Sequence, residues 1–197
     1  MSYYFYAMMQ RLSMIPRWNG TYSLKSEDVA QHSFNVVVFT HALCMIKKQI
    51  FNEEIDIEKA LEYAIFHDST DSITTHIISP IKNHSSIKEN YTITKQSAKK
   101  HLIKGLPIEL QSSYFNTLHV ENMDIEYIVE VADQLDGYCK AIFEVKRGNS
   151  EFKPILSKFE DSLGKLASEH EYIKYFLDNF IPSFLDEENN FKNMGVL

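Results

Sequence analysis

The sequence predicts an all-α protein. Glycine and proline are scarce, with 6 and 5 among 197 residues, and apolar residues recur at helical spacing rather than alternating as in strands. A chain of this length can bury a substantial core, and no internal repeat or long linker divides it. We therefore expect a compact bundle of about seven helices in a single domain over residues 1–185, followed by a polar tail over 186–197.

The first three helices have recognisable ends. A helix over Tyr3–Met14 should stop before Pro16, because the residue preceding a proline is pushed out of helical geometry. Ser26 is a plausible N-cap for a long helix over residues 27–48. Asp56 should cap a third helix that runs into His67.

The stretch "STDSITTHIISPIKNHSS", residues 69–86, is rich in β-branched residues and contains a Ser-Pro pair, which makes a long helix unfavourable. A functional loop is expected there. The helices expected beyond it cover residues 87–104, a segment that restarts near Pro107, residues 124–147, residues 152–167 and residues 172–180.

The composition and charge of the chain limit the kinds of molecule that it can bind and the compartment in which it works. The formal net charge of -7 and dispersed lysines argue against binding of a nucleic-acid polymer. The sequence shows no leader and no run of about 20 apolar residues, and its two cysteines form no CxxC motif. A cytoplasmic protein without a membrane partner is expected. The aromatic start "YYFY" should supply core and a subunit contact, which predicts a homo-oligomer, a dimer or larger.

Three predicted helices each point polar groups inward. His67 and Asp68 end one apolar helix, while His32 and Asp133 continue the apolar rows of two others. Taken singly, His32 could be a satisfied core histidine and Asp133 a helix cap or bridge. Buried charge is costly unless paired or bound to metal, so together the four suit a divalent transition ion that supports hydrolysis.

The short sequence segments around these residues resemble those of a known family. They are "PRW" at 16–18, "VAQHSFNVVVFTHAL" around His32, "FHDSTD" from Phe66, "SPIK" at 79–82, "VADQLDGY" around Asp133 and "YFLDNFIPSF" near the end. In order and spacing they resemble the bacterial 5'-deoxynucleotidases of the HD-domain metal-dependent phosphohydrolases. Related phage enzymes, which hydrolyse dATP to deoxyadenosine and triphosphate, are similar too.

The resemblance implies an HD-type helical fold and hydrolysis of 2'-deoxynucleotides at the 5' α-phosphate. It also implies one divalent ion (Mn, Co or Zn) held by four residues, with a second ion as an option for a triphosphate substrate. The implied metal ligands are His32, His67, Asp68 and Asp133.

Four further positions match the family's substrate site. Arg17 would hold phosphate through its planar fork, and Trp18 would pack against the deoxyribose so that a 2'-hydroxyl fits poorly. Lys82 would lie beside the phosphate. Asp71 would assist proton transfer, where the family usually carries a glutamate.

At two places the sequence departs from the residues usual in the family, and these departures leave open how many phosphates the substrate carries. The family's Gly-Asp-x-Pro-Thr-Pro-x-Lys begins here as Thr75-His76, and the usual glutamate is the shorter Asp71. A histidine in place of a carboxylate removes repulsion toward a more anionic ligand. The sequence therefore leaves monophosphate and triphosphate as equal alternatives.

Each of these residues also has an ordinary explanation. Asp71 could be a helix cap, Trp18 could pack in the core, and His76 could be an exposed loop histidine. Another class of function also fits the departures at Asp71 and His76: a catalytically impaired module that senses or sequesters deoxynucleotides.

Overall fold

The computed structural model describes residues 2–78, 84–186, 192 and 194. These residues form helices and no strand, as predicted, and seven of their helices have nine or more residues. The α-helices are α1 (Phe5–Gln10), α2 (Val29–Gln49), α3 (Ile57–Phe66), α4 (Asp71–Thr74), α6 (Ser85–Lys104), α7 (Ile108–Leu118), α8 (Met123–Lys146), α9 (Lys153–Glu169), α10 (Glu171–Asn179) and α11 (Ile181–Leu185), and the 3₁₀ helices are η1 (Arg11–Met14) and η2 (Ser150–Phe152).

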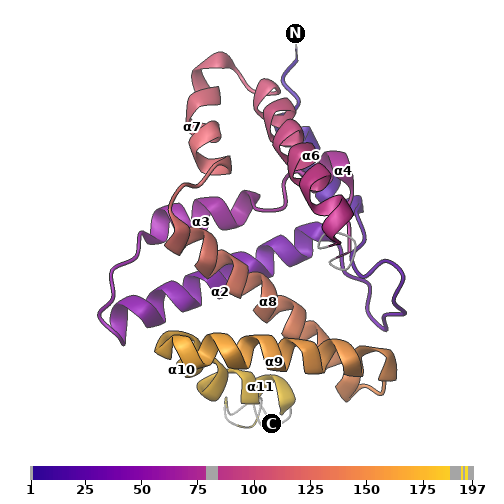
Figure 1. Ribbon diagram of the computed structural model, residues 1–197, viewed down its shortest axis with the longest axis vertical. Coiled ribbons are helices and arrows are strands. Elements are labelled where there is room, and N and C mark those ends of the chain that lie inside the picture. Colours follow the sequence, from indigo (N-terminus) through magenta and orange to yellow (C-terminus); the bar gives the residue numbers. More distant parts are fainter. Residues whose placement is uncertain (1, 79–83, 187–191, 193, 195–197) are drawn as a thin grey trace.

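Three tiers of helices are visible in Figure 1. α2, α3 and α8 cross in the middle, α9 to α11 lie on one side of them, and α6 with α7 lies on the other. The largest core cluster is formed by buried side chains of the middle and lower tiers, including Leu43, Ile128, Leu135 and Ile173. A second cluster around Phe5 and Leu102 joins α1 to the upper tier. The polar side chains of α2, α3 and α8 that are described below are therefore held by well-packed helices.

The start of α2 differs from the prediction. Its N-cap is Asp28, whose carboxylate accepts a hydrogen bond from the Gln31 backbone at 2.8 Å, whereas the predicted cap Ser26 lies two residues too early. The reason is a short antiparallel bridge between Pro16 and Asp28, which holds the chain before α2 in an extended form. A helix that began at residue 27 would break this bridge.

Other helix ends follow the sequence signals. Asp56 caps α3 as predicted, accepting from the Lys59 backbone at 3.1 Å. Gly148 follows α8 with φ +92°, a left-handed conformation that favours glycine. The N-terminal helix stops before Pro16 as expected, but its last turn tightens into the 3₁₀ helix η1.

The aromatic N-terminus has two faces. Phe5 is fully buried and packs edge-on against Phe66 and Tyr114. Tyr3, Tyr4 and Tyr6 are 64%, 44% and 57% exposed. The predicted contribution of this segment to the core is confirmed for Phe5, and the predicted subunit contact stays a prediction.

α2 is long and apolar enough, by length and composition alone, to cross a membrane. It lies, however, in the middle tier between α3, α8 and α10. One such helix is weak evidence for a span, because the core helix of a soluble protein has the same composition.

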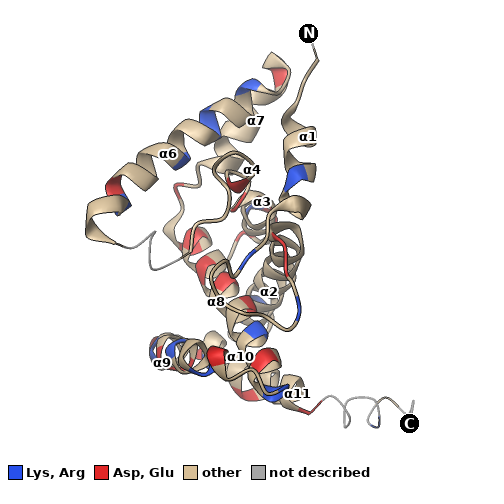
Figure 2. Cartoon of the chain, turned by 90° about the vertical axis from the view of Figure 1, so that its right-hand side faces the viewer, with Lys and Arg blue, Asp and Glu red and all other residues tan. Residues whose placement is uncertain are grey.

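Figure 2 shows acidic and basic residues interspersed on α9, without a one-sided basic face there.

Candidate metal centre and nucleotide pocket

His32 on α2 and His67 at the end of α3 lie close together, and the Nε2 atoms of their two rings face each other. His32 directs Nδ1 at the Asp136 carboxylate (2.6 Å), and His67 directs Nδ1 at the Ala64 carbonyl (2.8 Å). Both partners are acceptors, so each Nδ1 donates and each Nε2 of the neutral ring keeps its lone pair. The two Nε2 atoms lie 3.3 Å apart, which presents two lone pairs to one point in space.

Two carboxylates face the same point. Asp68 Oδ2 lies 3.6 Å from His32 Nε2 and 3.5 Å from His67 Nε2, and Asp133 Oδ1 lies 3.0 Å from His32 Nε2. His32 is fully buried and Asp68 nearly so, while the Asp133 side chain is half exposed at the mouth of the site. Acceptors crowded against acceptors repel unless a cation lies between them. The four side chains therefore fit a divalent ion.

Arg17 crosses the centre from the loop before α2. Its guanidinium lies 3.5 Å from Glu27, 3.9 Å from Asp133 and 3.8 Å from Asp136. The Nε and Nη1 atoms are buried and have no hydrogen-bond partner among the described residues. The side chain is thus held by charge, and it also lines the pocket beside the centre, where a guanidinium can pair with an anion such as phosphate.

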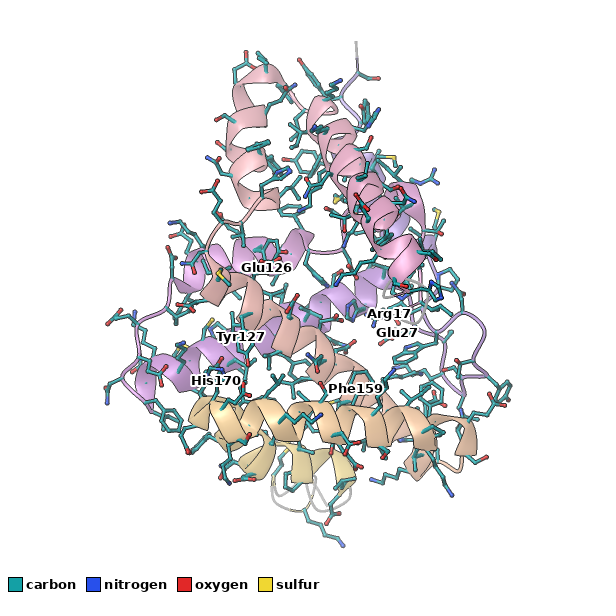
Figure 3. All side chains as sticks on the ribbon, viewed as in Figure 1. Arg17, Glu27, Glu126, Tyr127, Phe159 and His170 are labelled. Carbon is teal, nitrogen blue, oxygen red and sulfur yellow. The ribbon has the colours of Figure 1, made fainter. Side chains whose placement is uncertain are left out.

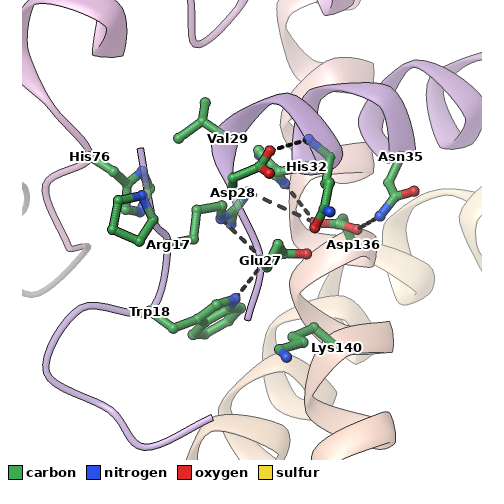
Figure 4. A network of polar contacts seen from close by, with 12 residues as sticks. Arg17, Trp18, Glu27, Asp28, Val29, His32, Asn35, His76, Asp136 and Lys140 are labelled. Atoms are coloured by element: carbon green, nitrogen blue, oxygen red, sulfur yellow. Dashed lines mark hydrogen bonds and ion pairs between the residues drawn. The ribbon is translucent and has the colours of Figure 1, made fainter. Parts of the chain in front are cut away.

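Glu27 and Asp136 are parts of this centre that the sequence reasoning missed (Figure 4). Asp136 orients His32 and also accepts from Asn35 at 2.8 Å. Burial raises the pKa of both Asp136 and Glu27, against the opposing effect of Arg17. One signal could have found Asp136, because it lies three residues after Asp133 and so shares its helix face.

Trp18 forms a wall of the adjoining pocket. Its indole donates to Glu27 at 2.6 Å and its ring packs on Phe152 at a centroid distance of 5.2 Å. The pocket measures about 540 Å³, and Arg17, Asp68, Asp133 and Phe159 also line it. In Figure 3, Arg17 and Glu27 lie near the start of α2, and Phe159 comes from α9. An aromatic wall beside a cation suits a ligand with a flat apolar part and an anionic part.

Asp71 and His76 form a pair beside Asp68. Asp71 is fully buried and its Oδ2 lies 3.1 Å from Nδ1 of His76, whose side chain is 11% exposed. The alternative of an exposed loop histidine is therefore wrong for His76. The alternative of a helix cap is also wrong for Asp71, since it is the first residue of α4 and that helix has no side-chain cap.

Thr75 holds the backbone between these two residues in an unusual conformation. Its φ of +62° and ψ of 169° fall in a region that is essentially restricted to glycine. The family that the sequence resembles has glycine at this position. Thr75 is thus a strained residue that fixes the path of the chain into His76.

Replacing Thr75 with glycine should therefore stabilise the fold. The substitution relieves backbone strain of about 1–3 kcal/mol and loses up to about 1 kcal/mol to the freedom of glycine in the unfolded chain. We expect the urea midpoint to rise. The matched control Thr74→Gly, in the helical residue before it, should lower the midpoint. A lower midpoint for Thr75→Gly as well would contradict the strain.

A second polar cluster, also absent from the sequence prediction, secures the loop that carries Trp18. The buried Glu144 carboxylate accepts hydrogen bonds from Ser23 (2.8 Å), from the Leu24 backbone (2.8 Å) and from Asn149 (2.8 Å), and it pairs with Lys140.

The predicted substrate residue Lys82 lies outside the described residues.

Comparison with known proteins identifies the family. The model of the YfbR-like 5'-deoxynucleotidases matches residues 4–184. The chain belongs to this family. A 4'-phosphooxetanocin A phosphatase of Priestia megaterium is 38% identical over 95% of this chain and 97% of its own. A 5'-deoxynucleotidase of Pasteurella multocida is 31% identical over 92% of this chain and 93% of its own.

Solved structures show the same fold. An HD-domain phosphohydrolase from Listeria innocua superposes with a TM-score of 0.81 at 22% identity, covering 93% of this chain and 89% of that one. The cyanophage S-2L HD phosphohydrolase DatZ, bound to dA and one catalytic Zn²⁺ ion, gives 0.53 at 15% identity over 81% of this chain and 96% of its own. The expected HD-type fold is confirmed.

Proposed function

We propose that this family member is a metal-dependent phosphohydrolase that releases a deoxynucleoside from 2'-deoxynucleotides. The observation that carries this proposal is the meeting of two imidazole lone pairs with the carboxylates of Asp68 and Asp133, beside a pocket with an aromatic wall. The names of the relatives, 5'-deoxynucleotidase and phosphatase, and the Zn²⁺ and dA of DatZ support it.

The metal would be held by His32, His67, Asp68 and Asp133. Two imidazoles with two carboxylates suit Mn²⁺, Co²⁺ or Zn²⁺. When bound, such an ion polarises a phosphoryl oxygen and lowers the pKa of water. Asp136 would keep His32 in the tautomer that offers Nε2, because its carboxylate accepts the Nδ1 proton.

The remaining residues would position the substrate and move a proton. Arg17 would pair its guanidinium charge with the 5'-phosphate, and Trp18 would cover the deoxyribose. Asp71 would accept a proton from the attacking water, and the 5'-oxygen would take up a proton, from Asp71 or from solvent, as its bond to phosphorus breaks. Lys82 would add a positive charge beside the phosphate, as its match to the family motif implies.

His76 affects how many phosphates the substrate can carry. It lines the pocket and brings an imidazole where the family motif has a carboxylate, so it repels a polyphosphate less. A monophosphate would give phosphate as the second product, and a triphosphate would give triphosphate. In both cases the attack is at the α-phosphorus.

Chromatography of nucleotide digests tests this function. With Mn²⁺, Co²⁺ or Zn²⁺, the purified chain should release deoxynucleosides from dNMPs or dNTPs faster than nucleosides from the ribonucleotides, because Trp18, as its match to the family implies, would leave little room for a 2'-hydroxyl. Tight binding of deoxynucleotides with no product after long incubation would contradict the proposal and indicate the sensing module.

For partners, we propose a deoxynucleotide as the ligand and a cytoplasmic homo-oligomer as the working form. The exposed tyrosines of the N-terminal segment support a subunit contact. The acidic net charge of -7 argues against a nucleic-acid polymer as partner. Light scattering of the purified protein would determine its size.

A further inference from the structure

Trp18 holds a backbone conformation that a bulky side chain rarely adopts. Its φ is +62°, in the left-handed region. The Thr21 backbone donates to the Trp18 carbonyl at 3.0 Å, and this bond closes a tight turn. Such a conformation persists only where the surrounding structure determines it, and it is concentrated at ligand sites. The direction of the indole is therefore set by its contacts rather than by the preference of its own backbone.

One hydrogen bond fixes the position of the indole ring. Trp18 Nε1 donates to Oε2 of Glu27 at 2.6 Å, while the ring lies tilted at 55° against Phe152. An indole has a single donor, and a hydrogen bond to a carboxylate is about twice as strong as one between neutral groups. Packing on Phe152 alone allows the ring to slide, whereas the hydrogen bond selects one position.

Glu27 is itself a firmly held anchor for this bond. Its carbonyl accepts from the Arg17 backbone at 2.9 Å. The next residue, Asp28, forms the bridge to Pro16 and caps α2. The Glu27 side chain is only 9% exposed. The two ends of the loop over residues 18–26 are thus joined beside Glu27, which gives its carboxylate a fixed place relative to α2.

The same carboxylate also faces Arg17, but Arg17 has other partners. Glu27 Oε2 lies 3.5 Å from Arg17 Nε (Figure 4). Without Glu27, the guanidinium would still face Asp133 at 3.9 Å and Asp136 at 3.8 Å. The Trp18 indole would lose the hydrogen bond that orients it. We therefore expect removal of the Glu27 carboxylate to act chiefly on Trp18.

Glu27 acts from behind the wall of the nucleotide pocket. It lines a separate cavity of about 490 Å³ together with Asn35 and Lys140, whereas Arg17 and Trp18 line the nucleotide pocket. A carboxylate that reached into that pocket would repel a phosphate. In this position Glu27 can serve the substrate only through the two side chains that it contacts.

We propose that Glu27 is a positioning residue that fixes the Trp18 indole and thereby sets the preference for the sugar of the substrate. This rests on the proposed function, in which Trp18 covers the deoxyribose. A wall held in one place excludes a 2'-hydroxyl, whereas a wall that can tilt admits it. Selection by the shape of a pocket amounts to about 10- to 200-fold, and Glu27 decides how much of it is realised.

Fluorescence reports on this site alone, because Trp18 is the single tryptophan of the chain. Glu27→Leu removes the acceptor. Glu27→Gln is the matched variant, since it loses the same charge beside Arg17 but keeps an oxygen that can accept from the indole. Without nucleotide, Glu27→Leu should lower the fluorescence anisotropy and increase quenching by acrylamide. Glu27→Gln should leave both close to the values of the unsubstituted chain.

Hydrolysis of a deoxynucleotide and of the matching ribonucleotide gives the second measurement. The ratio of their kcat/KM values should fall about tenfold in Glu27→Leu and stay within about twofold in Glu27→Gln. A general loss of structure would lower both values together and leave their ratio unchanged. The control Glu109→Ala, at an exposed glutamate of α7, should change neither the fluorescence nor the ratio.

Circular dichroism establishes that each variant is folded, and Glu27→Ala replaces Glu27→Leu if the larger side chain disturbs the loop. Unchanged anisotropy or an unchanged ratio in the variant without an acceptor would overturn the proposal. Equal losses in Glu27→Gln would overturn it too, because they would assign the effect to the charge beside Arg17. An unsubstituted chain that hydrolyses neither nucleotide would contradict the proposed function instead, and the fluorescence would still decide whether Glu27 holds the indole.

Discussion

Asp68→Ala should lower the rate of deoxynucleotide hydrolysis by about three orders of magnitude or more, equivalent to at least about 4 kcal/mol of activation free energy. The Asp68 carboxylate lies 3.5 and 3.6 Å from the two histidine Nε2 atoms. Alanine would remove the buried carboxylate at the centre of the site and leave two neutral imidazoles with the half-exposed carboxylate of Asp133. The measurement is deoxynucleoside release at saturating metal.

The control for this variant is Asp161→Ala, at an exposed aspartate of α9. It should retain the full rate. Asp68→Ala should also keep the helical circular dichroism spectrum, because the substitution removes a buried charge and leaves the packing of the middle tier intact. Turnover by Asp68→Ala at the rate of the unsubstituted chain would exclude the metal role of Asp68.

Glu144→Gln should lower the free energy of unfolding at pH 7 by about 2–4 kcal/mol. The glutamine amide cannot accept hydrogen bonds on both sides as the buried carboxylate does, and it leaves Lys140 without its counter-charge. The lost interactions are those that attach the loop over residues 23–25 to α8. Urea denaturation measures the change in free energy.

The pH dependence of the same pair of proteins gives a second measurement. Burial raises the pKa of Glu144, but hydrogen bonds from Asn149, Lys140, Leu24 and Ser23 outweigh it and lower the pKa to about 2. Because the folded value is depressed from the ordinary 4.5, the stabilisation is complete above about pH 5 and is lost as the pH falls toward 2.

The difference in stability between the unsubstituted chain and Glu144→Gln should therefore shrink between pH 5 and pH 2. Glu151→Gln, at the exposed glutamate that accepts from the Tyr22 backbone, is the control and should cost about 0.5 kcal/mol or less. A difference that stays constant from pH 7 to pH 2 would contradict the role of the Glu144 charge.

Much of the candidate centre could be predicted from the sequence because it obeys helical spacing. His32, His67, Asp68 and Asp133 each lie where an apolar helix face carries a polar residue, and the structure brings all four together. That they bind metal remains a proposal.

The residues that the prediction missed depend on tertiary contacts. Asp136 reaches His32 across 104 positions of sequence, and Glu144 reaches Ser23 across 121. The local pattern of α8 gives no signal for Glu144, and for Asp136 it gives only the helix face shared with Asp133. The cap of α2 was misplaced for a similar reason, since Ser26 and Asp28 are equally good caps and the bridge to Pro16 decides between them.

Hydrolysis in ¹⁸O-labelled water tests the central claim most directly, using the nucleotide digests described above. If water attacks the α-phosphorus, the label should appear in the released phosphate or triphosphate and be absent from the deoxynucleoside, and prior removal of the metal should abolish release. Label in the 5'-hydroxyl of the deoxynucleoside, or undiminished release by the metal-free chain, would contradict the account.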